Sequence, residues 1–135
     1  MAFYDWNPGI ETGIALIDSQ HRRLVDLIND LHEAMIARKG KEITARVLDE
    51  LADYTVYHFG VEERAFAKHG YERAAEQKAS HDHFVARLKD MRAKYERGSL
   101  MVNVEALDFL LGWIKKHILN EDMLYVPFFE DKSFD

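Results

Sequence analysis

The sequence predicts an all-α protein, an antiparallel up-down-up-down four-helix bundle with an N-terminal arm. Four segments carry apolar residues at helical spacing and are joined by short loops. Gly and Pro are scarce, at 7 and 2 among 135 residues, and period-2 strand patterns are absent from the sequence. A chain of this length suits one core, so we expect residues 1–135 to form a single domain.

The first predicted helix begins after Asp18 or Ser19, both good N-cap residues, and runs to about Lys39. Gly40 is its expected C-terminal stop. Apolar residues and two histidines repeat at i, i+3, i+4 and i+7 along one face. This face consists of His21, Leu24, Val25, Ile28, His32 and Met35.

Three further helices are predicted over residues 42–69, 72–97 and 103–121, with Gly70 and Gly98 ending the first two of these. The face of 42–69 consists of Val47, Leu48, Leu51, Thr55, His58, Phe59, Glu62 and Phe66. The face of 72–97 consists of Ala74, Gln77, His81, Phe84, Val85, Leu88, Met91 and Tyr95. The face of 103–121 consists of Leu107, Leu110, Trp113, Ile114 and His117.

Each predicted helix thus places a histidine on its apolar face. One such histidine is typical of a core residue bonded to a carbonyl, whereas four together indicate a shared site. Burying a carboxylate such as Glu62 is costly unless a cation compensates it, and no Lys or Arg lies nearby on the same stripe. Because the chain has no Cys, a transition metal must be held by His and carboxylate.

The spacing of these polar residues supports a metal site. His58 and Glu62 are separated by four residues, as are Gln77 and His81, so each pair lies one turn apart on one face. Four imidazoles and two carboxylates are more ligands than one tetrahedral zinc takes, but they suit two ions bridged by carboxylates. The Glu-x-x-His motif of ferritin-like bundles is absent from the sequence, which disfavours that class.

The end of the fourth helix leaves two acidic candidates open. Glu121 follows His117 by four residues, and spacing alone favours it as a bridge. Asp122 follows His117 by five residues, about 140° around an ideal helix. It can share a centre with His117 only on a terminating or distorted turn, with which the polar run 120–122 is compatible.

These motifs resemble the hemerythrin family, particularly its bacterial single-domain members. The resemblance extends from Trp6 to Tyr125. It is carried by Ile17-Asp18-Ser19-Gln20-His21, His58-Phe59-x-x-Glu62-Glu63, His81 before Phe84, and Trp113-Ile114-x-x-His117 followed by Asp122.

The resemblance implies two Fe ions in a non-haem, oxo- or hydroxo-bridged di-iron centre that binds molecular oxygen reversibly, for storage, transport, delivery or sensing. The implied ligands are His21 and His58 on one iron, His81 and His117 on the other, and Glu62 and Asp122 as bridges. The family pattern therefore favours Asp122 over Glu121. Oxygen binding of this kind implies that the protein is not an enzyme.

The sequence departs from the family at Gln77, where a third histidine on the second iron is expected. An amide is a weaker donor than imidazole, so Gln77 binds through oxygen, holds a water or leaves the position open. An open second iron favours the alternative function, a di-iron oxidase or peroxidase. Three apolar residues near His117 are expected to line an oxygen pocket, namely Trp113, Ile114 and Ile118.

Other polar residues receive structural interpretations. We expect His32 to be structural, His69 to interact with free carbonyls at a helix C-terminus, and Glu63 to be a solvated charge. A net charge of −6 disfavours nucleic acid and anionic membranes as partners. With no targeting or spanning segment recognised, we expect a cytoplasmic monomer, in which a fused signalling domain has no room.

Overall fold

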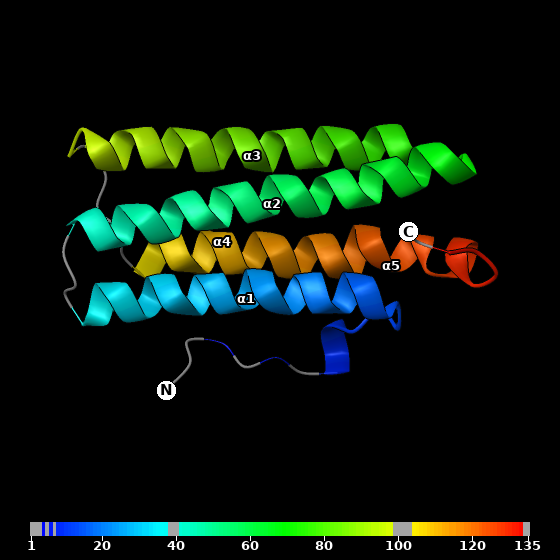
Figure 1. Cartoon of the computed structure of the whole chain (residues 1–135), viewed down its shortest axis with the longest axis horizontal. Helices are drawn as coiled ribbons and strands as arrows, with labels where there is room; N and C mark the ends of the chain where they lie inside the picture. The colour runs from blue at the N-terminus through cyan, green and yellow to red at the C-terminus, as the bar shows by residue number, and fades with distance from the viewer. Residues whose placement is uncertain (1–3, 5, 7, 38–40, 99–103, 134–135) are drawn as a thin grey trace.

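The structure is a computed structural model that describes residues 4, 6, 8–37, 41–98 and 104–133. Four long helices lie side by side along the long axis of the molecule and alternate in direction (Figure 1). They are α1 (Ala15–Ile36), α2 (Lys41–His69), α3 (Ala74–Glu96) and α4 (Val104–His117). Helix α2 packs against α1 and α3, and α1 also packs against α4. The predicted all-α antiparallel bundle is confirmed.

Short helical segments flank the bundle. The 3₁₀ turn η1 (Pro8–Ile10) precedes α1. After α4 the chain continues through a π-helical turn η2 (Ile118–Asp122), the short α5 (Met123–Tyr125) and a 3₁₀ turn η3 (Pro127–Phe129). The fourth helical stretch therefore extends beyond the predicted end at residue 121.

Helix α1 begins at Ala15, earlier than the predicted start after Asp18 or Ser19. Asp18 lies inside the first turns, and its carboxylate accepts hydrogen bonds from the backbone N–H groups of Thr12 and Gly13, at 2.8 and 3.0 Å. The carboxylate thus binds the loop before the helix instead of capping an N-terminus at its own position. This is why a good N-cap residue type misplaced the helix start.

The predicted ends of the second and third helices are confirmed by their glycines. Gly70 has φ 69° and Gly98 has φ 76°, left-handed conformations that favour glycine at a helix end. The predicted stop of the first helix at Gly40 lies outside the described residues.

The core has a main cluster between the four long helices and a smaller one at the end of the bundle where α2 meets α3. The smaller cluster consists of Ile17, Ala65, Phe66, Tyr71, Tyr125 and Phe129. It joins the start of α1, the end of α2 and the turn before α3 to the C-terminal segment. Among the described residues no helix is both long and apolar enough to cross a membrane.

Candidate metal centre

Histidine and carboxylate side chains from all four long-helix stretches meet near one end of the bundle. His21 lies in the first part of α1 and His81 in the first part of α3, whereas His58 lies late in α2 and His117 ends α4. Because neighbouring helices are antiparallel, the starts of α1 and α3 lie beside the ends of α2 and α4. The four histidines are 1–4% exposed, and each comes from an inward stripe of its helix.

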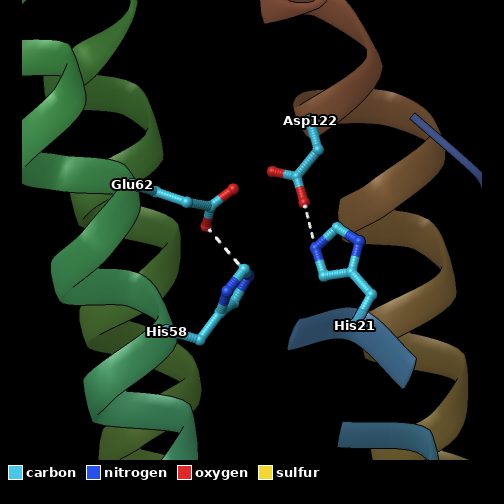
Figure 2. Close-up of side chains that lie close together, drawn as sticks. All are labelled: His21, His58, Glu62 and Asp122. Carbon is cyan, nitrogen blue, oxygen red and sulfur yellow. Dashed lines mark ion pairs between the residues drawn. The ribbon is translucent and has the colours of Figure 1, made fainter. Parts of the chain in front are cut away.

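The first group of possible ligands consists of His21, His58, Glu62 and Asp122, all buried. His58 Nε2 lies 3.3 Å from Glu62 Oε1, and His21 Nε2 lies 3.1 Å from Asp122 Oδ2. In Figure 2 the carboxylates of Glu62 and Asp122 point toward each other from α2 and from the segment after α4, with an imidazole beneath each. The four side chains offer atoms within 4.8 Å of one another.

The second group consists of Glu62, His81 and His117. Glu62 Oε1 lies 3.2 Å from His81 Nε2 and 4.0 Å from His117 Nε2. Asp122 also reaches this group, because its Oδ1 lies 3.1 Å from His117 Nε2. Glu62 therefore belongs to both groups, and the two oxygens of Asp122 face histidines of different groups.

The π-helical turn decides between the two acidic candidates of the fourth helix. A π-helix closes its turn five residues on, so Asp122 returns to the side of His117 despite the five-residue spacing. Asp122 is fully buried in the site. Glu121 instead lies on the outer side of the imidazole, with Oε1 3.0 Å from His117 Nδ1. The predicted distorted turn is present, and it places Asp122 in the group of possible ligands, whereas spacing alone favoured Glu121.

Gln77 lies within the same cluster and is 2% exposed. Its Nε2 donates a 3.2 Å hydrogen bond to Asp122 Oδ1, while its buried Oε1 has no hydrogen-bond partner among the residues that the structure describes. The amide therefore occupies the place that its spacing from His81 predicts, with a free carbonyl oxygen inside the site.

The donor atoms are arranged for cations. Four buried atoms have no hydrogen-bond partner within the described part of the chain, although they lie close together: Glu62 Oε1, Asp122 Oδ2 and the Nε2 atoms of His21 and His58. Such unsatisfied atoms are costly unless they bind an ion. The carboxylates in and around the site carry negative charge that two divalent cations can balance. The residues present fit a dinuclear metal centre.

The pKa shifts of the buried groups also indicate that the site favours a cation. Burial opposes a charge on His117, but Asp122, Glu121 and Glu62 outweigh it and raise the pKa of His117 well above its usual value. Burial raises the pKa of Glu62, yet the neighbouring imidazoles of His58, His117 and His81 hold it well below its usual value. The site therefore favours carboxylate anions and positive charge between them.

Family membership follows from comparison with known sequences. A family model described as the hemerythrin HHE cation binding domain matches residues 12–129. The chain belongs to the hemerythrin family.

Similar proteins include hemerythrins from several bacteria. The chain is 38% identical over 128 residues to bacteriohemerythrin of Pseudomonas aeruginosa, covering 93% of this chain and 81% of the relative. It is 35% identical over 128 residues to bacteriohemerythrin of Methylococcus capsulatus, covering 94% and 97%. A crystal structure of wild-type hemerythrin matches with a TM-score of 0.87 at 34% identity, covering 93% of this chain and 97% of that one.

Around this hemerythrin site, side chains hold the outer nitrogens of the histidines. Glu63 was expected to be a solvated charge, but its Oε2 lies 2.8 Å from His81 Nδ1. Gln20 was not singled out for the site, yet its Oε1 lies 2.6 Å from His58 Nδ1. Gln20 precedes His21, which is the one signal in the sequence that places it near the cluster.

Aromatic and aliphatic side chains enclose the hemerythrin site. Phe59 stacks on His81 with ring centroids 3.8 Å apart, and Trp113 stacks on His117 at 4.7 Å. Ile118 is fully buried, and Ile114 is 3% exposed. These surroundings are apolar on the side of His117, where the sequence predicts an oxygen pocket.

Three histidines lie outside both ligand groups, and one of them, His83, is exposed on α3. His32 lies on α1 beyond the site, and it is half-buried. His69 ends α2 as predicted, but its Nε2 lies 2.9 Å from the carbonyl of Ser133, which belongs to the C-terminal segment. The predicted interaction with free carbonyls of its own helix end is therefore replaced by a tertiary contact.

Proposed function

We propose that this protein binds molecular oxygen reversibly at a non-haem di-iron centre. The observation that carries the proposal is the double use of Glu62, whose Oε1 lies 3.3 Å from His58 Nε2 and 3.2 Å from His81 Nε2. A carboxylate common to two groups of histidines is the arrangement that bridges two ions. The named bacteriohemerythrins among its relatives support the same function.

Seven side chains would hold the centre. His21 and His58 would bind one ion, His81 and His117 the other, with Glu62 and Asp122 between them and Gln77 beside the second ion. Imidazole and carboxylate are suitable ligands for iron. Iron, when bound, supplies the electrons that oxygen binding requires.

The chain's own residues keep the site dry and hold its charges. Trp113, Ile114 and Ile118 would line the oxygen pocket and exclude water and protons, which promote oxidation. Tyr125 donates a 2.7 Å hydrogen bond to Glu62 Oε2. Burial and the negative charges of Glu62 and Asp122 raise the pKa of Tyr125 well above its usual value, so this donor keeps its proton.

Cycling between oxygen and argon tests the function. Protein loaded anaerobically with two equivalents of Fe²⁺ is expected to change its visible absorption on exposure to oxygen and to recover it under argon, over repeated cycles. His58→Ala is the matched control because it removes one proposed ligand from a buried position. An irreversible change on first exposure, or no change, would contradict oxygen carriage.

A di-iron peroxidase or oxidase is the second candidate, and Gln77 is the observation in its favour. Its amide is a weaker donor than the imidazole expected there, and its buried Oε1 has no hydrogen-bond partner in the described ranges. Consumption of hydrogen peroxide that depends on a reducing substrate would favour this candidate over reversible binding. Because the family model spans residues 12–129, we also propose that residues 1–135 form one domain.

A further inference from the structure

The two groups of histidines differ in what holds their outer nitrogens. In the second group both partners are carboxylates: His81 Nδ1 lies 2.8 Å from Glu63 Oε2, and His117 Nδ1 lies 3.0 Å from Glu121 Oε1. Ser80 donates a 2.8 Å hydrogen bond to the same oxygen of Glu121, which fixes that carboxylate. The outer nitrogen of each imidazole in this group therefore contacts a negatively charged carboxylate.

Among the described residues, no carboxylate lies next to the outer nitrogens of the first group. His58 Nδ1 lies 2.6 Å from Oε1 of Gln20, a neutral amide. His21 Nδ1 is buried, and none of the described residues forms a hydrogen bond with it. The two groups thus differ in the charge next to the outer nitrogens of their imidazoles. The second group, whose imidazoles contact carboxylates, is also the group with Gln77 in place of an imidazole.

A carboxylate that accepts a hydrogen bond from Nδ1 fixes the tautomer of the ring and increases the basicity of Nε2. Glu63 and Glu121 can do this at low cost, because they are 30% and 31% exposed and water still solvates their charge. A fully buried carboxylate in the same place would carry a much larger desolvation penalty.

We propose that Glu63 and Glu121 are positioning residues that strengthen His81 and His117 as metal donors and compensate the second ion for the amide at Gln77. The inference rests on the dinuclear centre of the proposed function. It goes beyond the proposed ligands, because Glu63 and Glu121 contact the ligand histidines and do not themselves bind an ion. The ion beside Gln77 is therefore bound by two imidazoles that each contact a carboxylate, in place of the three imidazoles that the family pattern predicts.

Calorimetric titration of the metal-free protein with Zn²⁺ tests the inference without oxygen or redox chemistry. Wild type is expected to bind two Zn²⁺ with two distinct constants. Glu63→Gln and Glu121→Gln, which keep side-chain shape and remove the charge, are each expected to weaken one and the same binding step by about 10- to 100-fold. The other step should change far less.

Asp82→Asn is the matched control. Asp82 adjoins His81 in sequence and carries the same charge, but its side chain is 64% exposed and pairs with Lys78. Its removal is expected to leave both Zn²⁺ constants unchanged.

Nitrogen NMR of the Zn²⁺-loaded protein gives a second measurement. The Nδ1–H resonance of His81 is expected to shift upfield in Glu63→Gln. In the calorimetric titration, Glu63→Asp should restore part of the Zn²⁺ affinity that Glu63→Gln loses. Unchanged constants and shifts in both glutamine variants, with two Zn²⁺ still bound, would overturn this inference alone. Fewer than two Zn²⁺ bound by wild type would overturn the dinuclear centre itself, and this inference with it.

Discussion

The hydroxyl of Tyr125 donates a 2.7 Å hydrogen bond to Oε2 of Glu62, the carboxylate that belongs to both ligand groups. Both residues are fully buried, and Tyr125 comes from the short α5 beyond the π-helical turn. The C-terminal segment thus holds one oxygen of Glu62 and leaves Oε1 to the histidines. Segments far apart in the sequence are coupled at the centre of the site.

Replacing Tyr125 with Phe should destabilise the metal-free protein. The variant leaves a buried carboxylate oxygen without its donor, and we expect the free energy of unfolding to fall by about 1.5–3 kcal/mol. Urea denaturation measures it. Tyr57→Phe is the control, since this ring is 53% exposed and its change should stay within about 0.5 kcal/mol. Similar values for the two variants would show that the hydrogen bond to Glu62 contributes little.

Loss of Glu62 should cost more metal than loss of a histidine that serves one ion. Glu62→Ala withdraws a negative charge from both ligand groups, whereas His21→Ala affects one group. We expect less metal per chain in Glu62→Ala than in His21→Ala after dialysis, measured by atomic emission. Circular dichroism checks that both variants remain helical. Equal retention would argue against a bridging role for Glu62.

Gln77→His should strengthen the second half of the site. An imidazole is a better donor than the amide, and the side chain already lies next to Asp122, 3.2 Å from its Oδ1. We expect higher metal retention, by about 10-fold in affinity, and a longer period over which the response to oxygen stays reversible. Azide titration should show weaker binding than in wild type. If all three properties match wild type, Gln77 or a water on it is already an adequate ligand.

The metal-free protein should lose stability below neutral pH through His58. Burial lowers the pKa of His58 from 6.5 to about 4, although Glu62 acts in the opposite direction. The unfolded chain then binds more protons between these values, so this contribution, up to about 3 kcal/mol, is present above pH 6.5 and lost as pH falls toward 4. Denaturation of wild type and His58→Asn at pH 7 and pH 4.5 measures it.

The expected result is that wild type loses more stability than His58→Asn over this range. The contribution of His117 to stability depends on pH in the opposite direction. Its pKa is raised, so its contribution is lost as pH rises through that value. Because both proteins keep His117, the comparison removes most of its effect, apart from its electrostatic interaction with His58. Parallel pH profiles would contradict a buried neutral His58.

The sequence by itself determined the helical bundle and the convergence of its histidines. The apolar stripe of each helix sets which way a residue faces, so His21, His58, His81 and His117 had to point into one core once four such stripes packed together. Glu62 follows for the same reason, because it lies one turn from His58. Periodicity is local, and it needs no knowledge of neighbouring helices.

The tertiary structure decided between Asp122 and Glu121. An ideal α-helix would favour Glu121, but the π-helical turn inserts an extra residue and places Asp122 in the core. Local propensity cannot predict such a turn, because it depends on how Ile118 and Asp122 are buried against other elements.

The outer contacts of the histidines were also decided by tertiary structure. Gln20 meets His58 across 38 residues of sequence, and Glu63 meets His81 across 18. The pattern along a helix gives the direction of each side chain around its own axis, and on that basis Glu63 faced solvent. Contact between helices depends on their stagger and crossing, which only the packed bundle sets.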